Sequence, residues 1–405
     1  MTGGTARETA RRRVRTLPRF PRSTRLIDTS PMIEDGNDGP ETIGRPQTST
    51  RDRDTLRTHL QAWLTSRLPD GASPRITSFE IPSSNGLSSE TVLLDVESDH
   101  DGTPRTDRLV ARLAPPASAV PVFPVYDLDR QAQVMRLVAT HTSVPVPVVR
   151  WSEPDPGPLG SPFFVMDRID GLVPPDLLPY NFGTWLSQAD AADQRRLQDA
   201  TIAVLAALHG IDDATTHFSF LRLAPGSALA AHVDDQRAYY RWVADGLRIP
   251  LLEQCFAWLE DHWPASEEPT GFSWGDSRIG NIMYRDFEPV AVLDWEMAGL
   301  GPPELDLGWL IFMHQFFEGV AAQFSLPGMP DFLRSDDVAT TYESLTSHSP
   351  RDLEFYIVYA ALRHGIIMSR IQRRAIHFGE ATMPEDPNDL ITHRAIIEEM
   401  LATAS

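Results

Sequence analysis

The sequence contains no lysine, and all 36 of its basic residues are arginines. A site that binds phosphate through a charged side chain must therefore use arginine, a planar fork of N–H donors instead of a single ammonium. The chain also has only one cysteine, Cys255, which excludes an internal disulfide framework and a cysteine-based zinc site. Cys255 lies in a segment with helical apolar spacing, so we expect a buried structural thiol.

Long hydrophobic runs are absent as well. No uninterrupted apolar stretch reaches the roughly 18 residues that a membrane-spanning helix needs. Hydrophobic residues still make up 41% of the chain, which is enough for a large core. We therefore expect a cytoplasmic protein with no membrane partner. The 405 residues suit two or three domains, or one large unit of two lobes.

Positive charge is scarce in most of the chain, whose formal net charge is -20. Nucleic-acid binding needs clustered cations, so we expect no nucleic-acid partner for the body of the protein. An acidic surface favours solubility and attracts cationic small molecules. The charge is thus a hint, though not a specific one, toward a cationic ligand.

Residues 1–50 differ from the rest. The first 25 hold eight arginines and a single acid, Glu8, and an acidic stretch with proline and glycine follows. Neither part has the apolar period of a helix or strand, so we predict a disordered, arginine-rich tail. No apolar stretch follows the arginines, which excludes a secretory signal. A basic arm for nucleic acid is left open.

Residues 51–170 carry the pattern of an antiparallel sheet lobe. Leucines and a tryptophan at helical spacing predict a helix over 53–68, and a second helix is expected over 127–140. Five runs rich in β-branched and aromatic residues, bounded by turn-forming residues, predict strands. They are ITSFEI (76–81), ETVLLDVES (90–98), DRLVARLAP (107–115), VPVPVVRWSE and SPFFVMDRIDG. The order β-β-β-α-β-β predicts an α+β nucleotide-binding lobe.

Residues 171–405 change to helical periodicity. The expected helices lie at 190–209, 235–246, 251–262, 305–317 and 353–376. One β insertion, NIMYRDFEPVAVLDWE, interrupts them. We therefore predict a larger, mainly helical C-terminal lobe for catalysis and substrate binding.

The most informative residues are Asp276, Asn281 and Asp294, in the segment FSWGDSRIGNIMYRDFEPVAVLDWE. The predicted hairpin between Asn281 and Asp294 brings an amide and a carboxylate to one place. Phosphoryl transfer needs a carboxylate to orient and deprotonate the attacking hydroxyl, and hard oxygen ligands for Mg²⁺. Asp276 suits the first role, and Asn281 and Asp294 suit the second. An ordinary glycine–aspartate turn explains Gly275-Asp276 alone, but not all three residues together.

The segment W-G-D-S-R-I-G-N…V-L-D-W-E resembles the signature of the aminoglycoside phosphotransferase and choline kinase-like family, which has a protein-kinase-like fold. The segments SSNGLSSETVLLD, RLVARLAPP, VPVPVVRW, LGSPFFVMDRIDG and AALHGID follow in the family's order. The resemblance covers residues 53–400 and is strongest to an actinobacterial group of aminoglycoside-phosphotransferase-like proteins. It extends to kinase domains that are joined to acyl-CoA dehydrogenases.

The resemblance implies ATP and Mg²⁺ as cofactors and places a nucleotide site in the first lobe. The serine- and glycine-containing loop after residue 82 resembles the family's phosphate-covering loop. Arg112 falls at the strand cation that faces the α- and β-phosphates, and Met166, Asp167 and Ile169 fall where adenine binds. The implied cofactor-binding residues are Ser84, Asn85, Gly86, Ser88, Arg112, Met166, Asp167 and Ile169.

Two departures from the family's pattern stand out. Trp274 occupies the position of a histidine that generally supports the catalytic loop. The helical glutamate that usually pairs with the strand cation is replaced, with Gln131 and Gln133 as the candidate positions. Both departures motivate an alternative function, a catalytically weak or inactive nucleotide-binding pseudokinase module. The intact Asp276, Asn281 and Asp294 argue for the enzyme.

Other residues near the motif carry two interpretations each. Glu296 is either a group that assists the metal ligands or a solvated strand carboxylate, and Arg278 either touches phosphate or substrate or lies on the surface. Asp306 reads as a cap or support for the catalytic loop. His209, which ends a helix, reads as structural.

The sequence thus predicts an ATP-dependent phosphotransferase that moves the γ-phosphate to a hydroxyl of a small molecule. The acceptor is open between an aminoglycoside-like compound, which the acidic body favours, and a hydroxyacyl compound, which the similarity to dehydrogenase-linked domains favours.

Overall fold

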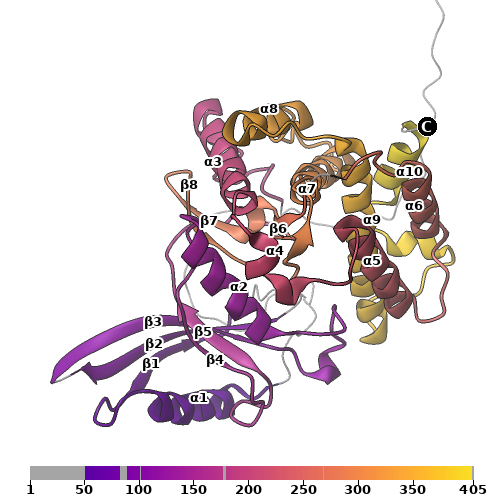
Figure 1. The fold of residues 1–405 in the computed structure, drawn as a ribbon. Helices are drawn as coiled ribbons and strands as arrows, with labels where there is room; N and C mark the ends of the chain where they lie inside the picture. Colours follow the sequence, from indigo (N-terminus) through magenta and orange to yellow (C-terminus); the bar gives the residue numbers. More distant parts are fainter. Residues whose placement is uncertain (1–50, 83–88, 101, 177–178, 268, 404–405) are drawn as a thin grey trace, which may run out of the picture. The chain divides into compact units, whose positions relative to one another are not determined.

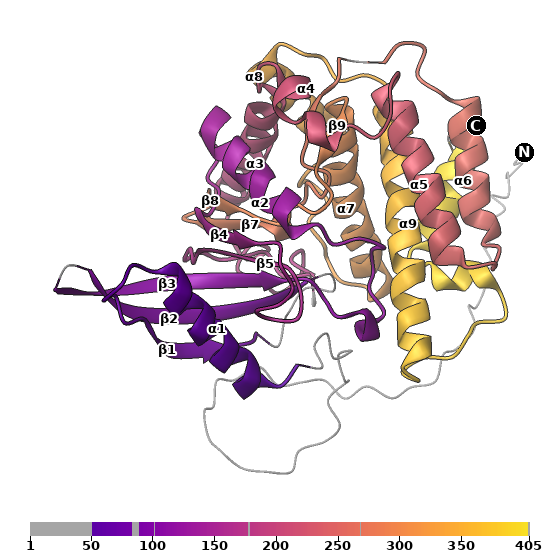
Figure 2. The same cartoon turned by 60° about the horizontal axis from the view of Figure 1, so that its bottom comes forward.

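The computed structural model describes residues 51–82, 89–100, 102–176, 179–267 and 269–403 of the chain. The tail expected over residues 1–50 lies outside this part. Residues 46–405 belong to one compact unit, in which a sheet of five strands is followed by a larger assembly of helices (Figures 1 and 2). We call these two parts the sheet lobe and the helical lobe.

The sheet is antiparallel throughout, in the order β1-β2-β3-β5-β4. Its strands are β1 (Arg75–Glu80), β2 (Glu90–His100), β3 (Thr103–Leu113), β4 (Val149–Glu153) and β5 (Phe163–Asp167). Strand β3 is central, and Arg112 on it pairs with Thr91 of β2 on one side and Phe164 of β5 on the other. This register places Arg112 beside the strand that leads into the connection between the two lobes.

Alternation along the strands gives the sheet two apolar faces. Val92, Leu94 and Val96 of β2 face helix α1 (Arg53–Arg67), whose Leu60 and Trp63 complete a separate cluster on that side. Helix α2 (Leu128–His141) covers the opposite face (Figure 1), where β3 and β5 residues merge with the core of the helical lobe. The sheet therefore has one face that belongs to its own lobe and one that is shared.

The helical lobe is arranged around two long helices in contact, α7 (Glu304–Gln323) and α9 (Leu353–His377). Gly308 of α7 lies against Tyr356 of α9 so closely that an added Cβ would be 2.7 Å from the Tyr356 backbone. Helices α5 and α6 flank α9 (Figure 2). The remaining helices of the lobe are α3 (Ala191–His209), α4 (Ala214–His217), α5 (Ala228–Ala244), α6 (Pro250–Asp261), α8 (Ser335–Thr346) and α10 (Arg394–Thr403).

Short β elements between α6 and α7 build the loop that carries the motif. Strands β7 (Ile282–Arg285) and β8 (Glu288–Val292) form the expected hairpin, and β6 (Gly271–Ser273) pairs with β9 (Gly299–Gly301). Side chains that accept from backbone N–H groups fix several helix starts. They are Asp52 for α1, Asp127 for α2, Asp190 for α3 and Ser227 for α5.

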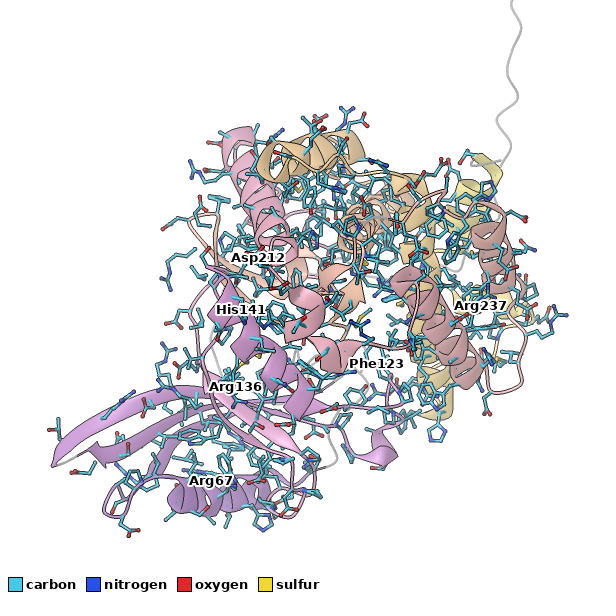
Figure 3. All side chains as sticks on the ribbon, in the orientation of Figure 1. Arg67, Phe123, Arg136, His141, Asp212 and Arg237 are labelled. Atoms are coloured by element: carbon cyan, nitrogen blue, oxygen red, sulfur yellow. The ribbon has the colours of Figure 1, made fainter. Side chains whose placement is uncertain are left out.

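The segment between β3 and α2 crosses from the sheet lobe to the helical lobe. Tyr239 Oη of α5 donates to the Val122 carbonyl over 3.0 Å, and Arg370 Nε of α9 donates to the Pro121 carbonyl over 2.8 Å. Phe123, labelled in Figure 3, stacks on Tyr239 with ring centroids 5.7 Å apart. The docked segment 121–126 thus links the start of α2 to the helical lobe.

The predicted order of the sheet lobe, β-β-β-α-β-β, is confirmed, as are the α+β class and the helical second lobe. Helices α8 and α10 were missed, as were β6 and β9. Helix α8 buries only Val338 and Tyr342, so it lacks the apolar stripe on which such a prediction depends. Among the described residues, no helix is long and apolar enough to cross a membrane. Cys255 is buried, and burial raises the pKa of its thiol to about 12.

Four buried histidines of the helical lobe predict sensitivity to mild acid. Burial lowers the pKa of His232 to about 3 and those of His314 and His393 to about 4, and it holds that of His364 well below 6.5. The unfolded chain takes up these protons near pH 6.5 and the folded chain does not. The stabilisation is therefore complete above pH 6.5 and is lost as the pH falls toward 4. We expect the melting temperature, scanned at constant ionic strength, to decline throughout that window.

The substitution His232→Gln should make this decline shallower. The matched control is His59→Gln on the exposed side of α1, which should leave the slope as it is in the parent. A melting temperature that stays constant down to about pH 4.5 would contradict the assignment of these imidazoles as neutral and buried.

Candidate active site

Asp276 lies in the loop between β6 and β7, with both carboxylate oxygens engaged. Oδ1 accepts from the indole Nε1 of Trp309 over 2.7 Å, and Oδ2 accepts from Nδ2 of Asn281 over 2.7 Å. Only 13% of its side chain is exposed. The carboxylate is therefore held in one orientation by two donors from different parts of the chain, an arrangement that suits a proton acceptor.

The backbone before Asp276 is anchored by Asp306, in the first turn of α7. The N–H groups of Trp274 and Gly275 each donate to its carboxylate over 2.8 Å, and His209 Nε2 lies 3.0 Å from it. Burial would raise the pKa of Asp306, but the hydrogen bonds from His209 and the two amides outweigh it and hold the pKa below its ordinary value. Asp306 thus supports the loop, as expected from the sequence, and His209 braces Asp306.

The tryptophan in place of the family's histidine also holds the loop. Trp274 is fully buried, and its Nε1 donates to the carbonyls of Leu293 and Asp294 over 3.0 and 3.1 Å. Its ring packs 5.8 Å from that of Trp295. The departure at this position therefore preserves a link between the Asp276 loop and the segment that carries Asp294.

Asn281 and Asp294 are adjacent across the β7–β8 hairpin, where the N–H of Leu293 donates to the Asn281 carbonyl over 2.9 Å. Because the Asn281 amide nitrogen donates to Asp276, the amide oxygen is left for another ligand. Asp294 has a positive φ of 54°, an uncommon conformation for a non-glycine residue that is concentrated at functional sites. One amide oxygen and one carboxylate fit a Mg²⁺ that also takes phosphate oxygens and water.

Within the described residues, no group of three or more histidine, cysteine, aspartate or glutamate side chains suits a metal ion. The described residues therefore offer no candidate for a metal site that is built from these side chains alone. Two oxygen donors, as at Asn281 and Asp294, would suffice only for a metal ion that takes its other ligands from a nucleotide and water.

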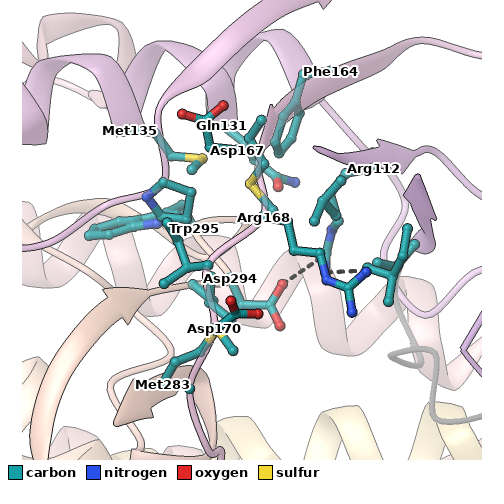
Figure 4. A pocket seen from close by; sticks show the side chains of 18 residues that line it. Arg112, Gln131, Met135, Phe164, Asp167, Arg168, Asp170, Met283, Asp294 and Trp295 are labelled. Carbon is teal, nitrogen blue, oxygen red and sulfur yellow. Dashed lines mark hydrogen bonds and ion pairs between the residues drawn. The ribbon is translucent and has the colours of Figure 1, made fainter. Parts of the chain in front are cut away.

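A cavity of about 310 Å³ opens between the sheet and the β7–β8 hairpin (Figure 4). Its walls include Arg112, Met166, Asp167, Ile169 and Asp294, all of them singled out from the sequence. Most of the lining is apolar, as in sites for flat organic ligands. Ser84, Asn85, Gly86 and Ser88 lie outside the described residues. Further lining side chains that the sequence did not single out include Leu93, Val110, Met135, Phe164, Met283 and Leu293.

Within the described residues, the connection between the lobes has free backbone donors at this cavity. The N–H groups of Asp167 and Arg168 donate to the carbonyls of Val148 and Arg108. The N–H of Ile169 finds no acceptor among the described residues. Ile169 is thus placed to donate to a ligand in the cavity, the role implied for it by resemblance.

Arg112 meets Asp294 across the cavity. Its Nη2 lies 2.5 Å from Asp294 Oδ1, and its Nη1 lies 3.4 Å from Thr91 Oγ1 (Figure 4). The guanidinium of Arg112 and the carboxylate of Asp294 therefore neutralise one another, and each is mostly shielded from water. A ligand with phosphate groups and a divalent cation offers each a stronger partner.

The two candidate glutamines of α2 lie on opposite sides of the helix. Gln131 is only 4% exposed and lines the cavity, whereas Gln133 is exposed. Within the described part of the chain, the Gln131 side chain has no hydrogen-bond partner, and Arg112 turns to Asp294 instead. Of the two candidate positions for the missing glutamate, Gln131 is thus the one that faces the cavity.

Arg278 is held inside the loop and is not a free surface arginine. Its Nη1 pairs with Asp176 over 2.5 Å, and its Nε lies 3.3 Å from Asp276 Oδ1. Glu296 does not line the cavity. Its charge adds to the effect of burial in raising the pKa of Tyr126, in the docked segment, to about 12.

Sequence reasoning missed Trp309, although it lies three residues after Asp306, which the sequence did single out. A signal was present, because Trp309 follows Asp306 by three residues on one helix, and such residues share a face. The sequence around Arg363 on α9 gave no such signal.

Comparison with known proteins agrees with this geometry. A family model described as "Phosphotransferase enzyme family" matches residues 82–327. Among curated relatives, "Probable acyl-CoA dehydrogenase IBR3" of Arabidopsis thaliana is 27% identical over 311 residues, which are 72% of this chain and 35% of that protein. This chain therefore spans about a third of that relative's length.

Solved structures share the fold. A candidate aminoglycoside phosphotransferase of Ralstonia eutropha superposes with a TM-score of 0.61 at 23% identity, covering 85% of this chain and 96% of that one. Aminoglycoside phosphotransferase APH(2'')-Ib, solved with ADP bound, gives 0.50 at 13% identity over 86% and 98% of the two chains. The resemblance and the kinase-like, two-lobed fold predicted from the sequence are thereby confirmed.

Proposed function

Because the chain belongs to this phosphotransferase enzyme family, we propose that it transfers the γ-phosphate of ATP to a hydroxyl group of a small molecule. The observation that carries the proposal is that Asp276 is hydrogen-bonded to Asn281, which lies beside Asp294, and that Asp294 pairs with Arg112 in the lining of an apolar cavity. Phosphoryl transfer requires an oriented carboxylate, ligands for a metal ion and a cation that faces the phosphates.

Each residue has one role in this proposal. Asp276, oriented by Trp309 and Asn281, accepts the proton of the attacking hydroxyl. Arg112 is placed to leave Asp294 for the phosphates, and Asn281 and Asp294 would hold a Mg²⁺, which would supply charge neutralisation of the transferring group. Arg278, beside Asp276, adds positive charge where the phosphoryl group arrives. The adenine ring of ATP lies against Met166 and Phe164 and accepts a hydrogen bond from the N–H of Ile169.

The acceptor in this proposal is an aminoglycoside-like or a hydroxyacyl compound. Solved relatives are named for aminoglycosides, and the matched curated protein is named as an acyl-CoA dehydrogenase. The acidic chain favours the former class. A cytoplasmic location and a small-molecule partner, with no nucleic acid or membrane, belong to the same proposal.

The test is ATP consumption with and without Mg²⁺ against four acceptor pools: aminoglycosides, choline-like amines, sugars and hydroxy acids. Calorimetry of Mg-ATP binding runs alongside. Turnover that requires Mg²⁺ and one pool supports the kinase and identifies its acceptor class. Binding of Mg-ATP without turnover in any pool favours a nucleotide-binding module, the alternative motivated by Gln131. Absence of Mg-ATP binding overturns both.

A separate prediction about metal affinity follows from the Arg112–Asp294 ion pair. Arg112 must leave Asp294 before a metal ion can bind there, and a partly exposed ion pair resists this by up to about 1 kcal/mol. In Gln131→Glu, a carboxylate on the cavity wall competes for Arg112 and releases Asp294. We expect the Mg²⁺ concentration for half-maximal nucleotide binding to fall about three- to fivefold, as about 1 kcal/mol implies.

The matched control is Gln133→Glu, which adds the same charge to the same helix on its exposed side. It should leave the Mg²⁺ titration at the parent value. Equal shifts in both variants would mean that only the net charge matters, and the explanation through Arg112 would then be wrong.

A further inference from the structure

Arg363, on α9, is an arginine buried beneath the loop that carries Asp276. Its side chain is only 2% exposed, and within the described residues no carboxylate forms an ion pair with it. Removing a guanidinium from water without a paired carboxylate is costly, and burial accordingly lowers its pKa. A cation that is buried at such a cost in free energy is expected to have a role in the protein that offsets this cost.

Two contacts of Arg363 lead to the Asp276 loop or to a residue that supports it. Nη2 donates to the carbonyl of Gly275 over 3.0 Å. The guanidinium lies over the ring of Trp309, 4.5 Å from its centroid, and 5.9 Å from the centroid of Tyr359. Aromatic faces stabilise a desolvated cation, most of all that of tryptophan.

The backbone N–H and carbonyl of Gly275 are therefore held by two buried side chains of opposite charge. Asp306 of α7 accepts from its N–H over 2.8 Å, and Arg363 of α9 donates to its carbonyl. That carbonyl belongs to the peptide unit joining Gly275 to Asp276. Its direction therefore fixes where the Asp276 backbone begins, and the two charges stand on helices α7 and α9, which pack against each other.

Arg363 reaches Asp276 by a second route. The indole on which it lies, that of Trp309, donates through Nε1 to Asp276 Oδ1 over 2.7 Å. The guanidinium plane limits rotation of that indole and so keeps its N–H aimed at the carboxylate. One buried cation thus constrains both the backbone and a side-chain oxygen of the same residue.

We propose that Arg363 is a positioning residue for Asp276, acting through the Gly275 carbonyl and the Trp309 indole. This inference rests on the proposed phosphotransferase function for its kinetic consequence, but its structural consequence stands without it. Loss of the guanidinium should loosen the loop and lower the rate of the chemical step, while the nucleotide cavity, which Arg363 does not line, keeps its affinity.

The test compares Arg363→Met with Arg373→Met. Methionine keeps an apolar stem of similar length, and replacing a buried charge by an apolar group is often neutral for stability. Arg373, ten residues further along α9, donates to the carbonyls of Val243 and Ala244 at the end of α5, so its variant removes a comparable helix-to-carbonyl contact away from the loop. Arg363→Lys keeps a donor for Gly275 without the flat stacking.

Two measurements are made on the full chain. For Arg363→Met we expect kcat to fall about 100-fold, the effect of a small misplacement of a catalytic group, with KM for Mg-ATP within about threefold. Amide hydrogen exchange of peptides covering 272–283 should quicken about tenfold or more, since the loop opens more often. Arg373→Met should match the parent in both, and Arg363→Lys should fall between the two.

Loop exchange in Arg363→Met equal to that of Arg373→Met would overturn the proposal. Loop exchange that rises together with a general loss of protection and an early unfolding transition would overturn it as well. A kcat within about twofold of the parent would also overturn it. If the parent has no turnover with any acceptor, the proposed function fails, and the exchange comparison still decides whether Arg363 holds the loop.

Discussion

In Asp276→Asn we expect turnover to fall about 10³-fold, within the range that general base catalysis supplies. The amide cannot accept the hydroxyl proton. It also cannot accept from both donors, because Trp309 Nε1 and Asn281 Nδ2 each need an oxygen where asparagine has only one. The variant thus loses both the acceptor and part of its orientation. The measurement is kcat with the acceptor identified in the pooled assay, together with calorimetry of Mg-ATP binding.

The matched control is Asp286→Asn, an exposed aspartate in the turn of the β7–β8 hairpin, whose positive φ asparagine tolerates. It should turn over like the parent. Mg-ATP affinity should be kept within about threefold in both variants, because Asp276 lies outside the cavity lining. Asp276→Asn turnover within about tenfold of the parent would remove Asp276 from the role of proton acceptor.

In Gly275→Ala we expect both activity and stability to collapse. Gly275 has φ +89°, and a Cβ there would lie 2.0 Å from the Met297 carbonyl oxygen, so the backbone itself must move. Left-handed strain and overpacking each cost about 1–3 kcal/mol, which predicts a loss of at least about 3 kcal/mol in the free energy of unfolding. The displaced peptide also carries Asp276. Denaturant unfolding and kcat are the measurements.

Gly299→Ala tests whether the effect is local to Gly275. Gly299 lies on β9, paired with Ser273 next to the loop, but a Cβ there meets nothing within 4 Å and its φ is not positive. This variant should unfold within about 1 kcal/mol of the parent, as glycine-to-alanine changes do where the backbone tolerates them. If Gly275→Ala unfolds like Gly299→Ala, the close approach to Met297 is not a constraint in solution.

The sequence predicted the parts of this protein that rest on local patterns. The β-branched run that contains Val92 and Leu94 and the helical stripe of α1 correctly predicted a strand and a helix of the sheet lobe. Motif spacing brought Asn281 and Asp294 to one hairpin, and the structure places them next to each other and to Asp276. Their roles remain proposals that the variants above test.

Contacts between distant segments could not be predicted in the same way. Gln131 and Gln133 were equal candidates because the helix period alone does not say which side faces the cavity. The pairing of Arg112 with Asp294 joins residues 182 positions apart. Arg363 lies 88 positions from the carbonyl that it binds, whereas Arg370 and Arg373 of the same helix bind the docked segment and the end of α5. Only tertiary packing distinguishes such residues from their neighbours.

The shared face of the sheet limits how this protein can be divided. Val110, Phe164 and Met166 belong to the same hydrophobic cluster as α7 and α9, and the docked segment 121–126 adds hydrogen bonds across the same seam. A fragment that stops near residue 170 would leave this apolar surface in water, and such surfaces promote aggregation. Exchanging nucleotide-binding halves between relatives would therefore fail unless the residues on both sides of this interface were exchanged together. Recombination within this family should follow the packing interface and not the connection between the lobes.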